Sequence, residues 1–97
     1  MEPLTTDESL LYEMSAEDFA RHCRAVEQYS RSAQRDLADF SVVVLGLPPA
    51  SNLQTVRAAA AAAGMVPRAR EILARIESAE AIERACRETV RRRGLDR

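Results

Sequence analysis

A regular spacing of apolar and small residues runs through the first half of the chain, from residue 19 to residue 44. These residues recur at alternating steps of four and three, the spacing that places side chains on one face of a helix. The positions are Phe19, Cys23, Val26, Ser30, Ala33, Leu37, Phe40 and Val44, and we call this set the 19–44 seam. Ser15 suits the N-cap, and no Gly or Pro follows it until Gly46. The pattern predicts a long helix over about residues 15–45, with the seam along one side.

A second, shorter helix is predicted over about residues 51–63. Gly46 and the following Pro48-Pro49 pair end the first helix, because Pro lacks the amide group that a continuing helix needs. Ser51 or Asn52 then provides the N-cap, and six consecutive alanines occupy positions 58 to 63. Gly64 follows them as a residue suited to end a helix in the left-handed conformation.

A third helix is predicted over about residues 67–93, because Pro67 suits the first turn and Gly94 suits the end. One apolar stripe follows its length: Ile72, Leu73, Ile76, Ala79, Ile82, Cys86 and Val90. Ser78 is able to cap a separate helix, which leaves a break there as an alternative. We favour a continuous helix, because no Gly or Pro interrupts it and oppositely charged residues four apart, such as Glu83 and Arg87, support it.

The N-terminal residues 1–14 are predicted to form a short helical or partly ordered segment. Thr5 and Glu8 have the spacing of a capping box, which would open a helix extending to about Met14. The chain has no stretch of alternating apolar and polar residues of the kind that predicts a strand. We therefore expect residues 1–97 to form a single all-α domain, a small helical bundle with two long helices and a shorter Ala-rich helix between them.

Charge is divided unevenly between the two halves of the chain. All basic residues are arginines; residues 1–50 hold four of them against nine carboxylates, and residues 51–97 hold ten against six. Opposite charges on the two halves would allow a head-to-tail contact between two copies of the chain. The alternative is that each half is simply a solvated charged surface.

Few residues are candidates for catalysis or metal binding. His22 is the only histidine; with Asp18 it could supply two metal ligands, fewer than a zinc site uses, and we expect neither a metal nor a cofactor. The two cysteines, Cys23 and Cys86, both fall on apolar stripes, so burial in the core is the expected role, and a redox or intermolecular disulfide role is the alternative. His22 cannot easily reach Cys23, because adjacent helical residues point about 100° apart. We therefore expect no enzyme activity.

Residues 55–75 have the outline of a helix-turn-helix, which makes nucleic-acid binding the alternative function. In that case Arg68, Arg70 and Arg75 would contact phosphates or base edges. Two observations oppose it: the net charge of the chain is −1, and Arg70 occupies a position at which such motifs bury an apolar residue.

The sequence favours a non-enzymatic protein-interaction module, an adaptor, chaperone-like protein or oligomeric subunit. A helix of about 30 residues is about 45 Å long, longer than a compact domain of this size is wide, so it needs an equally long neighbour. We expect a homodimer or a complex with a helical partner, with the seam residues Phe19, Val26, Leu37, Phe40 and Val44 as interface anchors. The acidic N-terminus lacks the features of a signal peptide, and no apolar run reaches the roughly 20 residues that span a membrane, so we expect a cytoplasmic protein without a membrane or small-molecule partner.

Overall fold

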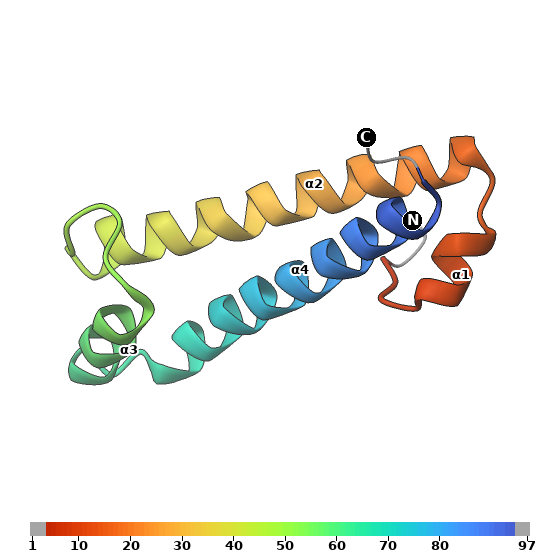
Figure 1. Cartoon of the computed structure of the whole chain (residues 1–97). Helices are drawn as coiled ribbons and strands as arrows, with labels where there is room; N and C mark the ends of the chain where they lie inside the picture. The colour runs from red at the N-terminus through yellow and green to blue at the C-terminus, as the bar shows by residue number, and fades with distance from the viewer. Residues whose placement is uncertain (1–3, 95–97) are drawn as a thin grey trace. The chain divides into compact units, whose positions relative to one another are not determined.

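The computed structural model describes residues 4–94 of the chain, and all of its regular structure in that range is helical (Figure 1). The elements are α1 (Glu8–Glu13), α2 (Ala16–Asp39), the π-helical segment η1 (Phe40–Val44), α3 (Leu53–Ala62) and α4 (Val66–Arg92). The prediction of an all-α fold with two long helices and a shorter one between them is confirmed. The helix α4 is continuous through Ser78, as expected from the lack of Gly and Pro. None of the described helices is long and apolar enough to cross a membrane.

Polar side chains cap the start of α2 and of α3, as the sequence indicates. The Ser15 hydroxyl accepts a hydrogen bond from the Asp18 amide at 3.1 Å. The Asn52 side-chain oxygen accepts one from the Thr55 amide at 2.8 Å, so Asn52 rather than Ser51 is the N-cap. Each bond satisfies one of the amides that the first turn of a helix leaves without a partner.

The prediction of Thr5 as the N-cap of the first helix is wrong, because Asp7 caps α1. The Asp7 carboxylate accepts hydrogen bonds from the amides of Ser9 and Leu10 at 3.0 and 3.4 Å. The Thr5 hydroxyl instead accepts a hydrogen bond from the Asp7 amide at 3.0 Å, which fixes the residue before the helix. A carboxylate at this position also suits the positive end of the helix dipole.

The first long helix ends where the sequence predicts, but its last turn is wider than an α-helical turn. In η1 the Leu45 amide donates to the Phe40 carbonyl at 3.0 Å, across five residues, and Gly46 then adopts a φ of +68°. A π-helical turn advances each residue by less than the 100° or so of an α-helix. The wider turn therefore displaces Val44 from the seam, and Val44 is 53% exposed.

The turn between α3 and α4 is a Schellman motif centred on Gly64. The Met65 amide donates to the Ala60 carbonyl at 2.8 Å, and the Gly64 amide donates to the Ala61 carbonyl at 3.2 Å. Gly64 has a φ of +72°, a conformation in which a side chain would be strained. The motif returns the chain directly into α4, which begins at Val66, one residue before the predicted Pro67.

Two compact units make up the chain, and each takes segments from both long helices. Among the described residues, the first unit contains residues 4–30 and 78–94, and the second contains Arg31–Glu77. In the first unit, the buried cluster consists of Leu11, Phe19, Val26, Ile82, Ala85 and Cys86. In the second unit, it consists of Phe40, Val56, Ala60, Ala69 and Ile72. Each unit therefore has its own small apolar core.

Arg93 fastens α1 within the first unit. Its guanidinium donates hydrogen bonds to the carbonyl oxygens of Leu11 at 3.0 Å and Met14 at 2.8 Å, at the end of α1. The same group lies 4.8 Å from the centre of the Phe19 ring, a cation–π contact. A six-residue helix is too short to be stable alone, so these contacts and the burial of Leu11 hold it in place.

We predict that Arg93→Met lowers the free energy of unfolding by about 1.5–3 kcal/mol, the usual contribution of hydrogen bonds to a charged group. Methionine retains an unbranched stem over Phe19 but donates no hydrogen bond to the end of α1. Urea unfolding measures the change. The matched control is Arg91→Met, which removes an exposed arginine paired with Glu88 and should have little effect. Equal destabilisation by the two variants would contradict the assigned role of Arg93.

Candidate functional site

Most of the predicted interface anchors lie inside the chain's own cores. Phe19 and Val26 in the first unit and Phe40 in the second are each 3% exposed. Leu37 is half-buried against the core of the second unit, and Val44 is exposed. The chain therefore buries most of these seam residues in its own cores. As a result, Phe19, Val26 and Phe40 have almost no exposed surface for a partner to contact.

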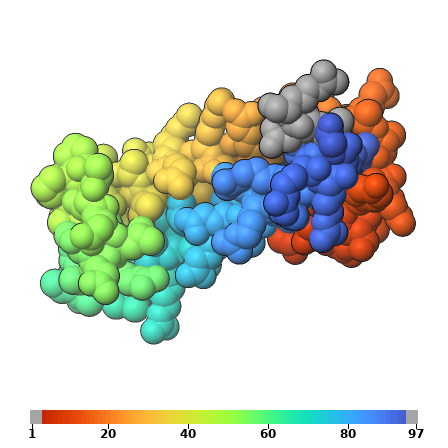
Figure 2. All heavy atoms as spheres, in the orientation of Figure 1, coloured from red at the N-terminus to blue at the C-terminus, as the bar shows by residue number. Residues whose placement is uncertain are grey.

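A groove lies between α3 and the start of α4 in the second unit. It has a volume of about 490 Å³ and combines six apolar residues with three charged ones. The apolar residues are Ala60, Ala61, Val66, Ala69, Leu73 and Ala74, and the charged residues are Arg57, Arg70 and Glu77. We call it the arginine groove. Figure 2 shows α3 and the first turns of α4 packed directly against each other in this unit.

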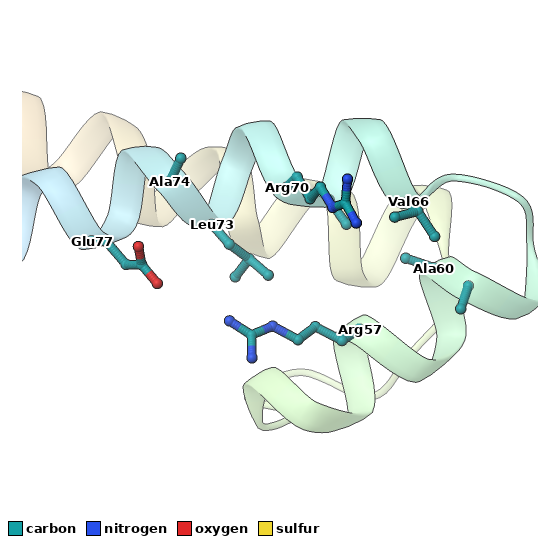
Figure 3. Close-up of a pocket in the computed structure, with 9 residues that line it drawn as sticks. Arg57, Ala60, Val66, Arg70, Leu73, Ala74 and Glu77 are labelled. Atoms are coloured by element: carbon teal, nitrogen blue, oxygen red, sulfur yellow. The ribbon is translucent and has the colours of Figure 1, made fainter.

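Alanines make up most of the apolar lining of the groove. Ala60 on α3 and Ala69 on α4 are both buried, and their single methyl groups let the two helices approach closely. Arg57 extends beneath Leu73 with its guanidinium toward Glu77, and Arg70 projects from α4 beside Val66 (Figure 3). An apolar floor with arginines at its edge suits a large apolar side chain that has a carboxylate next to it.

The three arginines of the nucleic-acid alternative have different surroundings. Arg68 is exposed and paired with Glu71 at 3.1 Å, and Arg70 is exposed at the arginine groove. Arg75 is half-buried, where it forms an ion pair with Asp36 and donates to the Ser32 hydroxyl at 3.4 Å. Arg75 therefore connects α4 to α2 within the second unit, and two of the three arginines already have carboxylate partners.

In the first unit, one face of α1 carries an exposed aromatic residue between carboxylates. Tyr12 is 54% exposed, and it borders a shallow hollow together with Glu8, Ser9, Glu13 and Arg92. Glu8 is half-buried and lies 3.8 Å from Arg92, whereas Glu13 is exposed. We call the residues Glu8, Tyr12 and Glu13 the acidic α1 face.

His22, Cys23 and Cys86 meet in the core of the first unit, although Cys86 is distant in sequence. The Cys86 sulfur lies 3.5 Å from His22 Nδ1, and Cys23 packs against the buried cluster that contains Cys86. The sequence predicts burial for both cysteines, and Cys86 is buried while Cys23 is half-buried. It did not predict that His22 reaches the distant cysteine. The only signal was the position of both cysteines on the stripes of the two long helices.

Burial raises the pKa of both thiols. The pKa of Cys86 is raised to about 12, first by burial and then by the nearby Cys23 and Glu83. Burial also raises the pKa of Cys23, while the neighbouring Cys86 thiol and the charge of Arg93 oppose that increase. Both residues are therefore neutral thiols at pH 7. No group of three or more metal-ligating side chains is arranged to hold a metal ion among residues 4–94.

Comparisons with protein-family models, with curated proteins and with solved structures find no match to this chain.

We predict that the chain binds duplex DNA no more tightly than micromolar at physiological salt. Arginine–phosphate contacts would make binding fall steeply as salt rises, which fluorescence anisotropy over a salt series detects. Nanomolar, salt-sensitive binding that disappears when Arg68, Arg70 and Arg75 are replaced together would instead establish the nucleic-acid alternative.

We also predict a loss of stability at alkaline pH that depends on Cys86. Its pKa is 9.0 for an ordinary thiol and about 12 in the folded protein, so the unfolded state loses the proton first. The stabilising contribution is complete below about pH 9 and is lost as the pH rises toward 12. Urea unfolding of the wild type and of Cys86→Ala should show parallel pH dependence from pH 6 to 8. Above pH 9 the wild type should lose stability more steeply than the variant. Parallel curves above pH 9 would contradict the assignment.

Proposed function

We propose that this chain is a non-enzymatic protein-interaction module that associates with a second copy of itself. The arginine groove of one copy receives the acidic α1 face of the other. Tyr12 enters the apolar floor of the groove, and Glu13 lies against Arg57 or Arg70. The observation that carries the proposal is the complementary chemistry of two surfaces on one chain, an apolar groove edged by arginines and an exposed tyrosine flanked by carboxylates.

The charges of the two units support this choice of occupant. Among the described residues, the first unit holds seven arginines against nine carboxylates, and the second holds six against four. Like units therefore repel each other, and unlike units on different copies attract. Long-range attraction of this kind increases the association rate and selects the orientation, while the apolar contact contributes affinity.

Tyrosine is well suited to anchor such a contact. Its ring buries a large apolar area with little loss of side-chain freedom, and its hydroxyl remains able to bond at the edge of a groove. The groove volume of about 490 Å³ is ample for one aromatic side chain and its neighbours. Two contacts of this kind related by a two-fold axis would produce a homodimer, in which each copy supplies one groove and one α1 face.

Sedimentation equilibrium over a range of protein concentrations tests the proposal. We expect reversible self-association that weakens as salt rises, because exposed charges contribute. Tyr12→Ser and Arg70→Glu should each weaken association by roughly tenfold or more, the effect of removing an interface anchor. Arg35→Glu is the matched control: it makes the same charge change at an exposed position of the second unit away from the groove.

A charge exchange distinguishes a direct contact from an indirect effect. Arg70→Glu and Glu13→Arg should each associate poorly alone, whereas an equimolar mixture should recover association, because the reversed charges again face each other. Val43→Asp tests whether copies associate instead through the exposed valines of η1, because Val43 is 77% exposed. A folded monomer at all concentrations, or association that Val43→Asp abolishes and Arg70→Glu leaves intact, would contradict the proposed contact.

A further inference from the structure

Within the described chain, neither arginine of the arginine groove has a carboxylate partner. Among residues 4–94, the side chains of Arg57 on α3 and Arg70 on α4 form no ion pair and no hydrogen bond. By contrast, Arg68 and Arg75 in the same unit are each paired with a carboxylate. The two guanidinium groups of this groove are therefore open to an anion from solution.

The apolar floor of the groove is elongated along α4. Val66 and Leu73 both line it, and residues seven apart lie on the same side of a helix. At 1.5 Å per residue, the floor between them extends for about 10 Å. The groove volume of about 490 Å³ lies within the range of roughly 300–1,000 Å³ that small-molecule sites have. A floor of this form suits an extended acyl tail.

The two ends of the floor differ in charge. Arg70 projects beside Val66 at the start of α4, where the first turn of the helix has no acidic residue (Figure 3). The positive end of the helix dipole adds to the arginine charge there. At the other end, Glu77 extends toward the Arg57 guanidinium and offsets part of its charge. An anionic group is therefore favoured at the Arg70 end, with its apolar tail over Leu73.

We propose that the arginine groove binds a free medium-chain fatty acid. The carboxylate lies against Arg70, and the acyl tail extends over Ala69 and Leu73. A guanidinium group binds a carboxylate through two parallel hydrogen bonds, which fixes the orientation of the ligand. The sequence predicts no small-molecule partner, because the site exists only once α3 and α4 lie side by side.

The fatty acid occupies the same surface as the acidic α1 face of a second copy. Binding of the ligand depends on the groove alone, whereas its effect on assembly rests on the proposed function. Both occupants combine an apolar group with a carboxylate, so they exclude each other. Fatty acid above its dissociation constant therefore converts associated copies into liganded monomers.

Backbone amide NMR titrations of Tyr12→Ser with octanoate and with octanol test binding without competition from a second copy. We expect octanoate to shift the amides of residues 57–74 saturably, with an affinity that falls as salt rises. Arg70→Gln in this background should weaken octanoate binding about tenfold, because hydrogen bonds to a charged group are lost. It should leave octanol binding unchanged, because the alcohol carries no charge. Arg35→Gln, at an exposed position outside the groove, is the matched control and should change neither.

A substitution that fills the floor provides a second test. Ala61 is exposed and lines the groove, so Ala61→Trp should abolish the shifts caused by both probes. Ala58→Trp, at an exposed position of the same helix that does not line the groove, should retain them. The site is wrong if millimolar octanoate causes no saturable shift, if Arg70→Gln weakens both probes equally, or if Ala61→Trp binds normally.

Sedimentation equilibrium of the wild type with octanoate separates this site from the proposed function. If both are correct, octanoate lowers the average mass, and its apparent affinity falls as the protein concentration rises. If the chain does not self-associate, octanoate binds the wild type and Tyr12→Ser equally, which retains the ligand site and removes its effect on assembly. If copies associate and bound octanoate leaves the average mass unchanged, the proposed competition is wrong.

Discussion

Burial of the apolar faces of α2 and α4 is the constraint on which the rest of this structure depends. Phe19 and Val26 share a core with Ile82 and Cys86 in the first unit, and Phe40 shares one with Ile72 in the second. The chain has few large apolar residues, and 17 of its 97 residues are alanines. Because these residues are used internally, the buried seam residues Phe19, Val26 and Phe40 are not available to a partner.

Two local contacts complete the two cores at the ends of the helices. Arg93 donates to the carbonyls at the end of α1 and places a charge over Phe19, so a six-residue helix closes one end of the first core. In the second unit, Ala60 and Ala69 allow α3 and α4 to pack closely and leave the arginine groove between their outer faces. Alanine thus acts at this site through its small size.

Periodicity and capping residues predicted the helices closely, because both act over only a few residues. Ser15, Asn52 and Gly64 have the local roles that their residue types favour. Two features were not predicted. The π-helical turn that displaces Val44 has no marker in a run of valines, and the approach of His22 to Cys86 depends on the register between α2 and α4. The spacing of the seam correctly predicted that one side of α2 is apolar. Spacing alone does not show whether the helix that packs on that side belongs to the same chain or to a partner.

We infer that the chain buries most of the seam in its own cores and that two copies contact each other through the arginine groove and the acidic α1 face. Backbone amide NMR spectra recorded over a dilution series test it most directly, because each residue reports separately. We predict concentration-dependent shifts for residues 8–13 and for residues 57–73, together with constant shifts for the buried seam residues Phe19 and Val26. Large shifts at those two residues on dilution, with residues 57–73 unchanged, would show that copies meet along the seam and would contradict the claim.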